Sequence, residues 1–574
     1  MSPDNAARRP AALRRYDAAV PHPAPSTDAL FLALRRMRAP LVAVVAVFTV
    51  AVVGLALIPG VDDRGEPYWM SAFDAFYFMA YTATTIGFGE VPHAFTRSQR
   101  LWVTICIFAS VVVWAYAIGA LLALIQDQAF RGALARQSFV RRVRRLRRPF
   151  LILVGYGQMG RAAAEALDAL GRSCVVVASS QESIDALVGA QLSSDIPGLA
   201  GDARDPGVLG LAGLGSKYCA GVLALTDDDA ANLSIVMAVT LLRPDVPVIA
   251  HANRPDTDKA MREFGADSVV NPFERYGNYL VTRLRRPSTY RLVTWLTAPP
   301  GDPVGPAVAP RPDGHWIVAA DDHFGEEIVG DLEDAGLTCS RVWPVDGAPD
   351  VMGAVGFVSA GLDDAQNLAM AGHVRLTNPD AFLVVRQKSR RNDALLRAFG
   401  ADSVFVAAHL TVQESLARVI TPDFWDFVQY AWGLPDDEGG ALLERLVAVV
   451  GHGSPDSQRF VIGDRDAPAV ERWLRRHTLV LGDLFRHPDD RDVPIQALPV
   501  LVIRDGVPSF APDLGEQVRS GDVIVAVGRP RAFVTLADAL YYDHTLEYVA
   551  TGQVVPATWL WRILTRPARS SSQA

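Results

Sequence analysis

Glycine occupies alternate positions after a threonine in one five-residue segment: Thr85, Ile86, Gly87, Phe88 and Gly89. Gly87 and Gly89 allow backbone dihedrals that a β-carbon would oppose. Stacked backbone carbonyls of such a segment can replace the water shell of a dehydrated K⁺ ion, and the Thr85 hydroxyl would add a further ligand. The segment therefore predicts a K⁺ selectivity filter. The alternative is a glycine-bearing loop between two unrelated apolar helices.

A second glycine pattern begins directly after an apolar strand expected at Phe150–Val154. It consists of Gly155, Tyr156, Gly157, Gln158, Met159 and Gly160, and a helical stretch follows at Arg161–Leu170. In this G-x-G-x-x-G spacing the first glycine makes a tight turn, the second admits a diphosphate, and the third lets helix and strand pack. The pattern predicts a nucleotide site in a Rossmann-like fold; a glycine turn without a ligand is the alternative.

The nucleotide prediction extends to residues at the ends of the next expected strands: Ser179, Asp202, Thr226 and Asp227. Proteins that bind NAD carry an acid about 20 residues after the glycines. This chain has Ser179 there, and Glu182 would be the nearest substitute. The ligand is therefore predicted only as an adenine nucleotide: NAD(H), ATP, ADP or AMP. The acids at 227–229 could hold a cation, but acids at a helix start also match the helix dipole, which is the favoured interpretation.

Two apolar runs flank the filter segment, at Leu41–Ile58 and Leu101–Ile125. Each is near the ~20 residues that cross a bilayer as a helix. Ser71–Thr84 is amphipathic and too short to span, so it predicts a half-helix whose negative C-terminal end points at the filter. Irregular backbone is stable at membrane depth only where protein buries it or it lines a cavity. The order of segments therefore predicts a pore.

On these residues, the segment 41–125 resembles the pore module of two-helix tetrameric K⁺ channels. Residues 85–89 match the family's Thr-Val-Gly-Tyr-Gly, with Ile86 for Val, Phe88 for Tyr, and Glu90 after them for the usual Asp. The resemblance implies a homotetramer, because one filter strand cannot enclose an ion. Gly119, within the second span, is predicted either as a gating hinge or as a point of close helix packing.

The distribution of arginine predicts the membrane topology. Arg35, Arg36 and Arg38 precede the first span, and an arginine run at 141–148 follows the second. Lys and Arg collect on the cytoplasmic side. We therefore expect a multi-pass protein of the cell membrane with both termini in the cytoplasm. The run at 141–148 is interpreted as a topology signal on a solvated helix, with binding of anionic membrane lipid as the alternative.

Composition limits the other function classes. A length of 574 residues suggests several domains, and a formal net charge of −8 gives no reason to expect a nucleic-acid partner. The four cysteines show neither metal spacing nor a disulfide framework: Cys106, Cys174, Cys219 and Cys339. The 11 histidines form no ligand pair at helical or finger spacing. We therefore expect no enzyme activity and no metal beyond K⁺ in the filter.

Residues 150–298 resemble the regulator-of-K⁺-conductance domain, also called the Trk/Ktr N-terminal nucleotide-binding domain. The stretches that carry this resemblance are Gly155–Gly160, Gly201–Ala203, Leu225–Asp228, Asn232 with Leu233, and Phe264–Asp267. The resemblance implies a Rossmann core and a crossover helix, near Phe273–Trp295, that docks onto a partner domain.

A second copy of this domain follows the first. Phe264–Val269 recurs as Phe399–Val404, and the same offset of 135 carries Asn232 to Asn367. A repeat of this length indicates duplication of a whole domain.

The fingerprint is degenerate in the second copy. Gly160 corresponds to Gly325 at an offset of 165, so the second copy lacks about 30 residues between the two regions. The first two glycines of the pattern have become Ala320 and Asp322. A carboxylate in that place would repel a diphosphate. The second copy is therefore predicted to bind no nucleotide.

The expected fold class is an α-helical membrane pore followed by α/β structure, with two tandem Rossmann-like domains and a small β-rich C-terminal subdomain. The expected layout is a basic N-terminal arm at 1–38, a pore module at 39–128, a basic linker at 129–149, a first domain at 150–298, a linker at 299–312, a second domain at 313–435, a C-terminal subdomain at 436–550 and a tail at 551–574. Residues 442–490 have no assigned structure.

These predictions combine into a ligand-gated, K⁺-selective channel in which a nucleotide acts on a cytosolic ring. One alternative is a K⁺ transporter subunit of the Trk/Ktr class, which would carry several pore repeats where this chain has one. The other is a membrane-anchored NAD(P) oxidoreductase, which would need a substrate domain with acid–base residues.

Overall fold

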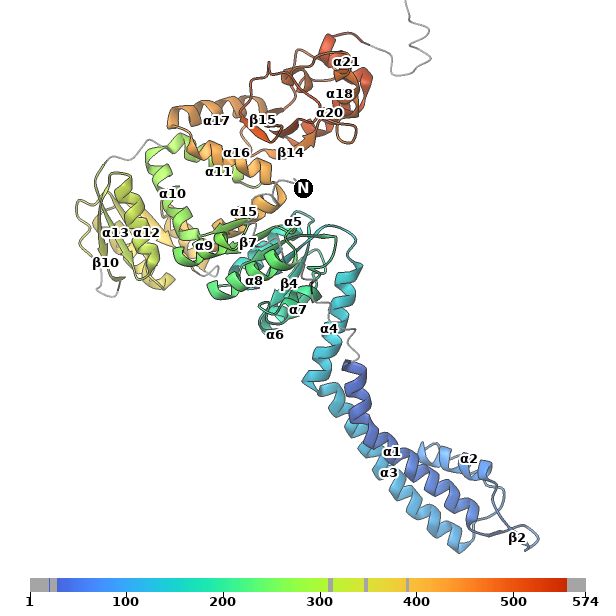
Figure 1. Ribbon diagram of the computed structural model, residues 1–574. Helices are drawn as coiled ribbons and strands as arrows, with labels where there is room; N and C mark the ends of the chain where they lie inside the picture. The colour runs from blue at the N-terminus through green and yellow to red at the C-terminus, as the bar shows by residue number, and fades with distance from the viewer. Residues whose placement is uncertain (1–19, 21–27, 308–312, 345–348, 389–391, 555–574) are drawn as a thin grey trace, which may run out of the picture.

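The computed structural model describes residues 20, 28–307, 313–344, 349–388 and 392–554. Most of the predicted N-terminal arm and C-terminal tail lies outside these residues. Figure 1 shows an elongated molecule, with a helical module at one end, α/β units in the middle and a smaller mixed unit at the other end. This arrangement confirms the predicted fold class.

The membrane module contains α1 (Asp28–Leu57), α2 (Ala72–Ala83) and α3 (Arg97–Gln126), with a short hairpin of β1 (Gly60–Val61) and β2 (Pro67–Tyr68). Helices α1 and α3 lie side by side (Figure 1). Residues 35–57 and 97–126 are long and apolar enough to cross a membrane as helices. They agree with the two predicted spans.

The two long helices approach closely at Gly54. A β-carbon on Gly54 would lie 2.2 Å from Cζ2 of Trp102. The indole Nε1 of Trp102 donates a hydrogen bond to the Ala51 carbonyl at 3.2 Å. A glycine on one helix therefore admits an indole from the other, and α2 packs beside this contact through Met79.

The pore module is joined to the rest of the chain at Asp127, between α3 and α4 (Gln128–Arg145). The Asp127 carboxylate accepts a hydrogen bond from the Phe130 backbone N–H at 3.0 Å and so caps α4. The same carboxylate pairs with Arg36 of α1 at 2.5 Å. The N-terminal part of α1 and the C-terminal end of α3 therefore meet at the start of α4.

Helix α4, expected as a basic linker, extends away from the membrane module (Figure 1). Its 18 residues span about 27 Å. Phe139 and Val143 are buried in the first α/β core, and Arg142 pairs with Asp195 at 3.1 Å. This part of the arginine run is thus packed against the first α/β unit, and lipid binding there stays a prediction.

The first α/β unit is built on a parallel sheet with strand order β5-β4-β3-β6-β7-β8. In that order the strands are Gly198–Ala200, Ser173–Ala178, Phe150–Val154, Cys219–Ala224, Val248–His251 and Ser268–Val270. The helices are α5 (Gln158–Ala169), α6 (Gln181–Val188), α7 (Pro206–Leu211), α8 (Asp229–Leu242) and α9 (Pro255–Glu263). Separate apolar cores lie on the two faces of the sheet, which explains why the strands read as continuous apolar runs.

The second α/β unit has a parallel sheet with order β10-β9-β11-β12-β13. Its strands are Thr338–Val342, His315–Ala320, Gly356–Ala360, Phe382–Arg386 and Ser403–Phe405, and its helices are α12 (His323–Asp334), α13 (Asp364–Thr377) and α14 (Asp393–Phe399). In the part of the chain that the structure describes, this unit has no counterpart of α6, β5 and α7. The shortening predicted from the two offsets is therefore the loss of an edge strand with its helices.

The strand registers of the two sheets are the same. Side-by-side residues across three strands are Val154, Ala224 and Ala250 in the first sheet, and Ala319, Ser359 and Val385 in the second. These positions differ by the offsets of 165 and 135 found in the sequence. Residues related by the offsets therefore occupy equivalent places.

The two units exchange helices. Helices α10 (Pro272–Arg285) and α11 (Pro287–Thr297) follow the first unit, and α15 (Ala407–Ile420) and α16 (Pro422–Gly433) follow the second. Phe273 and Tyr276 of α10 are buried in the core of the second unit. Val412 and Leu416 of α15 are buried in the core of the first. The crossover implied by the resemblance is present, and each core depends on the other unit.

The C-terminal unit contains an antiparallel sheet with order β14-β17-β15-β16. Its strands are Asp456–Val461, Val523–Gly528, Ala497–Arg504 and Val507–Phe510, and its helices are α17 (Asp436–Val450), α18 (Pro468–Leu474), α19 (Leu481–Leu484), α20 (Pro530–Tyr541) and α21 (Asp543–Thr551). The unassigned stretch 442–490 supplies β14, α18, α19 and the C-terminal part of α17. One face of the sheet packs with α11 and α16, so this unit rests on the crossover helices.

Candidate functional sites: a pore loop and a nucleotide site

The filter segment follows α2 directly. Ser71 begins the half-helix by accepting a hydrogen bond from the Asp74 backbone N–H at 3.1 Å. At the other end, the Tyr81 carbonyl accepts hydrogen bonds from the N–H groups of Ile86 at 2.9 Å and Gly87 at 3.2 Å. The chain therefore turns sharply at the C-terminal end of α2, where the negative end of the helix dipole lies.

Left-handed backbone recurs at every second residue of the filter segment. The φ angles are 63° at Thr85, 67° at Gly87 and 75° at Gly89. Ile86 and Phe88, which lie between them, are not among the residues with positive φ, so the backbone alternates along the segment. Thr85 has a branched β-carbon, so its conformation costs about 1–3 kcal/mol, the kind of strain that gathers at functional sites. The loop is thus suited to present stacked carbonyls to a cation.

Glu90 connects the C-terminal end of the filter segment to α2. The Tyr81 hydroxyl donates a hydrogen bond to the Glu90 carbonyl at 2.7 Å. The Tyr77 hydroxyl donates to Glu90 Oε2 at 3.1 Å. The Phe88 ring lies edge-on to Tyr81, with centroids 5.9 Å apart. Two tyrosine hydroxyls of the half-helix therefore tether Glu90 next to Phe88.

Replacing Tyr81 with phenylalanine is expected to lower the K⁺ over Na⁺ permeability ratio. It removes the hydrogen bond to the Glu90 carbonyl, worth about 0.5–1.5 kcal/mol, while keeping the ring. Tyr77→Phe is the matched control, because Tyr77 holds only the Glu90 side chain and should have a smaller effect. Reversal potentials under opposed K⁺ and Na⁺ gradients measure both; an unchanged ratio in Tyr81→Phe would contradict this role.

Gly119 lies within the unbroken helix α3. No other part of the described chain comes within 4 Å of the place that its β-carbon would take. Close helix packing at Gly119 is therefore not observed within the single subunit, and its hinge role stays a prediction.

The predicted nucleotide residues gather at one edge of the first sheet. Gly155 follows β3, Ser179 follows β4, Asp202 lies just beyond β5, and Thr226 just beyond β6. The strands are parallel, so these positions share the carboxyl edge. The order of connections reverses between β3 and β6, and such a switch point is where ligands of doubly wound sheets bind.

Two of the three fingerprint glycines are required by packing alone. A β-carbon on Gly155, whose φ is 94°, would lie 2.8 Å from the Leu225 carbonyl oxygen. A β-carbon on Gly160 would lie 1.9 Å from the Gly155 carbonyl oxygen. At Gly157 a β-carbon would meet only Asp227 Oδ2, at 3.4 Å. Gly157 therefore leaves the N-terminus of α5 open, where backbone N–H groups and the dipole favour a phosphate.

The other residues of the fingerprint divide between core and surface. Tyr156 and Met159 are buried in the core on the α5 face of the sheet, and Gln158 is exposed. The Tyr156 hydroxyl has no hydrogen-bond partner among the described residues. Burial raises the pKa of Tyr156. Of Tyr156, Gln158 and Met159, only Gln158, at the first position of α5, is exposed to solvent beside Gly157.

The predicted nucleotide residues that follow β4 and β5 are exposed. Asp202 forms an ion pair with Arg204 at 2.9 Å, and hydrogen bonds from Arg204 lower the pKa of Asp202. Ser179 lies exposed after β4, and Ser180 caps α6. Glu182 is exposed in the first turn of α6. The use of Glu182 as a ribose acid stays a prediction.

Thr226 is part of a buried clamp. Its hydroxyl donates to Asn232 Oδ1 at 2.7 Å, and Asn232 Nδ2 donates to the carbonyls of Thr226 at 2.8 Å and His251 at 2.9 Å. Asn232 thus ties the end of β6 to the end of β7. Asp228 caps α8, which supports the interpretation of the acids at 227–229 as a helix start. Asp227 remains exposed beside Gly157.

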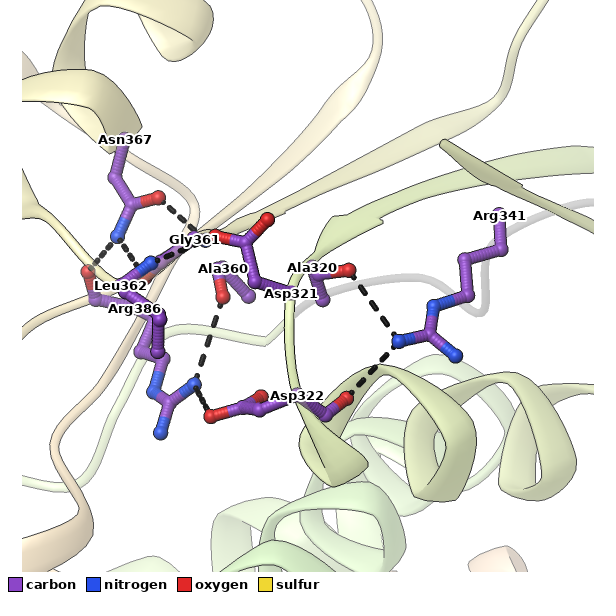
Figure 2. A network of polar contacts seen from close by, with 9 residues as sticks. All are labelled: Ala320, Asp321, Asp322, Arg341, Ala360, Gly361, Leu362, Asn367 and Arg386. Carbon is purple, nitrogen blue, oxygen red and sulfur yellow. Dashed lines mark hydrogen bonds and ion pairs between the residues drawn. The ribbon is translucent and has the colours of Figure 1, made fainter. Parts of the chain in front are cut away.

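The second unit repeats the clamp but fills the nucleotide site. Asn367 Nδ2 donates to the carbonyls of Gly361 at 3.2 Å and Arg386 at 3.0 Å, as Asn232 does in the first unit. Asp322 occupies the place of Gly157, and its Oδ2 pairs with Arg386 Nη1 at 2.7 Å (Figure 2). This copy therefore carries a negative charge of its own where the first copy is open.

Two arginines neutralise this corner of the second unit. Only 7% of the Arg386 side chain is exposed, and its guanidinium lies 5.1 and 5.0 Å from the ring centroids of Phe273 and Phe324. Arg341 donates to the carbonyls of Ala320 at 3.4 Å and Asp322 at 3.2 Å (Figure 2). Sequence reasoning found the acid at 322 but missed both arginines.

Two family models match the chain. Residues 42–127 match the ion channel model, and residues 151–272 match the TrkA-N domain model. The chain joins an ion-channel pore module to a TrkA-N domain. Both segments are those on which the two resemblances rest, and the pore loop and the glycine turn lie inside them.

Curated relatives of the chain include proteins named as potassium channels. "Potassium channel protein 1" of Methanocaldococcus jannaschii is 27% identical over 202 residues, which are 35% of this chain and 59% of the relative. "Voltage-gated potassium channel Kch" of Escherichia coli is 23% identical over 235 residues, 40% of this chain and 52% of the relative. The chain thus spans about half the length of these relatives.

Among solved structures, the chain is similar to "GsuK channel bound to NAD". The TM-score is 0.43 and the sequence identity 14%, over 89% of this chain and 99% of that chain.

Proposed function

We propose that this chain is the subunit of a ligand-gated channel that conducts K⁺ passively across the cell membrane. The observation that carries the proposal is the loop after α2, whose left-handed φ recurs at Thr85, Gly87 and Gly89 between two helices of spanning length. The ion-channel match at 42–127 and the potassium channels among the relatives support K⁺ as the permeant ion.

The proposed assembly is a homotetramer, with both termini of each chain in the cytoplasm. A single loop cannot surround an ion, and Ile86 and Phe88 are 58% and 63% exposed in the isolated subunit. Copies arranged around a common axis would cover these apolar side chains and close the ring of carbonyls. The arginines at the start of α1 meet the start of α4 through Arg36 and Asp127, which supports one cytoplasmic end for both spans.

The proposed regulatory ligand is an adenine nucleotide at the N-terminus of α5. The connection to the pore is short, because α4 contributes Phe139 and Val143 to the core under β3 and runs directly from α3. The exchanged helices α10 and α15 would carry a change in the first unit to the second. The ligand shifts gating only by its differential affinity for the two states.

Flux measurements on the full chain in liposomes test this function. We expect K⁺ flux that Na⁺ does not match, and a nucleotide effect of about 5–150-fold, the usual range of allosteric coupling. NAD⁺, NADH, ATP, ADP and AMP are added one at a time on the cytoplasmic side. Equal Na⁺ and K⁺ flux would refute the filter. Selective flux that no nucleotide alters would refute the ligand gate.

The same preparation separates the alternatives. An oxidoreductase would consume NAD(P)H without K⁺ flux, and a transporter subunit would need further pore repeats. The described part of the chain contains one pore loop.

A further inference from the structure

The two copies differ in charge at one pair of equivalent positions. By the shared strand register, Gly157 corresponds to Asp322, and His251 at the end of β7 corresponds to Arg386 at the end of β12. In the second copy these two positions form the ion pair at 2.7 Å. In the first copy, Gly157 has no side chain and His251 carries a buried imidazole.

His251 lies on the face of the sheet that carries the α5 N-terminus. It alternates with Ile249, which belongs to the core under α5 and α15. Arg386 likewise alternates with Val384, which belongs to the core that holds Phe324 of α12. The two side chains therefore point to equivalent faces, each toward the helix that begins at its glycine-type turn.

The imidazole of His251 is enclosed and incompletely bonded. Only 2% of the residue is exposed, and its Nδ1 has no hydrogen-bond partner among the described residues. The core on this face of the sheet is apolar and includes Met159 of α5 with Ala408 and Val412 of α15. A buried polar atom without a partner calls for an explanation, and a ligand that arrives later supplies one.

The charged groups around His251 lie on or beside α5, α8 and α15. The titratable residues on the elements packed around β7 are Asp227 and Asp229 at the start of α8, Arg161, Glu165 and Asp168 on α5, and His409, Glu414 and Arg418 on α15. Glu414 is held by Arg275 and Arg418. Burial lowers the pKa of His251, and the carboxylates of Asp229 and Asp227, together with hydrogen bonds to the Val270 backbone and the Asn253 side chain, oppose this effect without overcoming it. Burial therefore favours the neutral ring in the free protein.

We propose that His251 takes up a proton when a nucleotide binds at Gly157 and so supplies the positive charge that faces its phosphate. This proposal rests on the proposed nucleotide site. In the second copy, Asp322 marks where the negative charge lies and Arg386 marks the direction of its partner (Figure 2). The imidazole of His251 is shorter than the guanidinium of Arg386, whereas the phosphate group of a nucleotide is larger than the carboxylate of Asp322. The larger phosphate would therefore fill the part of the gap that the longer guanidinium fills in the second copy.

The physical reason is linkage. A phosphate next to the ring favours the imidazolium, so the pKa of His251 is higher in the complex than in the free protein. A group whose pKa rises on binding strengthens binding at low pH, and this contribution is lost as pH rises through the pKa of the complex. In the pH range between the pKa of His251 in the free protein and its pKa in the complex, uptake of one proton makes the affinity fall by up to about tenfold per pH unit. Nucleotide control of the pore would then follow cytosolic pH.

Calorimetry on the full-length protein in detergent tests the proposal. NAD⁺ is the probe, because its diphosphate has no proton to exchange near neutral pH, and titrations run from pH 6 to 8 in two buffers of different ionisation enthalpy. We expect uptake of up to one proton per bound NAD⁺ and weaker binding at higher pH. ADP is the second probe. Protons exchanged by its own phosphate are measured with His251→Gln and subtracted from the proton uptake of the unmodified protein.

Variants isolate the residue. His251→Gln should bind more weakly at pH 6 and lose the pH dependence. His251→Arg, which installs the charge of the second copy, should bind without proton uptake. His373→Gln on α13, a histidine outside the site, should behave as the unmodified protein. If neither nucleotide binds, the proposed site itself is wrong. If binding occurs without proton uptake, or if His251→Gln keeps the pH slope, only the role of His251 is overturned.

Discussion

Alanine in place of Gly87 is expected to abolish K⁺-selective current. Gly87 has a φ of 67°, and a β-carbon in that region costs about 1–3 kcal/mol in every subunit of the proposed tetramer. No atom of the described chain lies within 4 Å of the place of that β-carbon. The loss would therefore come from the backbone alone, because the chain would relax toward a right-handed conformation and turn carbonyls away from the axis. Single-channel recording in lipid bilayers, with K⁺ on one side and Na⁺ on the other, measures the effect.

Gly119→Ala is the matched control for this experiment. Gly119 also has open space around the place of its β-carbon, but it lies in regular helix without a positive φ. The control variant should keep its K⁺ over Na⁺ preference, and the predicted hinge role of Gly119 concerns only its open probability. Current through Gly87→Ala with the selectivity of the unmodified chain would show that the filter has been misassigned.

The pore module was predictable because its signals are local. The expected half-helix at 71–84 differs from α2 only by its two capping residues, Ser71 and Thr84. The serine cap, the apolar stretch and the alternating glycines all lie within 20 residues of one another. By contrast, β14 in the unassigned stretch 442–490 pairs with β17 at 523–528. Nothing close to β14 in the sequence indicates that partner.

The candidate nucleotide site was predictable in part. Strand, glycines and helix follow one another directly, so Gly155, Gly157 and Gly160 could be identified from spacing. Arg386 was missed because its partner Asp322 lies 64 residues away, and an arginine at the end of a strand carries no signal by itself. The offset of 135 relates Arg386 to His251. Comparison of the two copies could therefore have identified Arg386, whereas the spacing of residues within one copy could not.

Aspartate in place of Gly157 is expected to remove nucleotide binding from the first copy and to leave the pore selective. The new carboxylate would face a bound phosphate at about 4 Å, which costs on the order of several kcal/mol at intermediate dielectric. Asp227 Oδ2 lies 3.4 Å from the place of the new β-carbon and adds a second negative charge. Each 1.4 kcal/mol lowers affinity about tenfold, so the expected loss exceeds a hundredfold. The second copy avoids this repulsion because Leu362 stands at the position of Asp227 and Arg386 neutralises Asp322.

The double variant Gly157→Asp with His251→Arg separates charge repulsion from misfolding. It builds the ion pair of the second copy into the first, so it should melt closer to the unmodified protein than Gly157→Asp does, yet still bind no nucleotide. The unmodified chain should bind one nucleotide per subunit, because the second copy already holds its own carboxylate at the phosphate position. Calorimetry and thermal melting on the full-length protein measure these quantities. Two equivalent nucleotides per subunit, or affinity unchanged by Gly157→Asp, would contradict this assignment of the two copies.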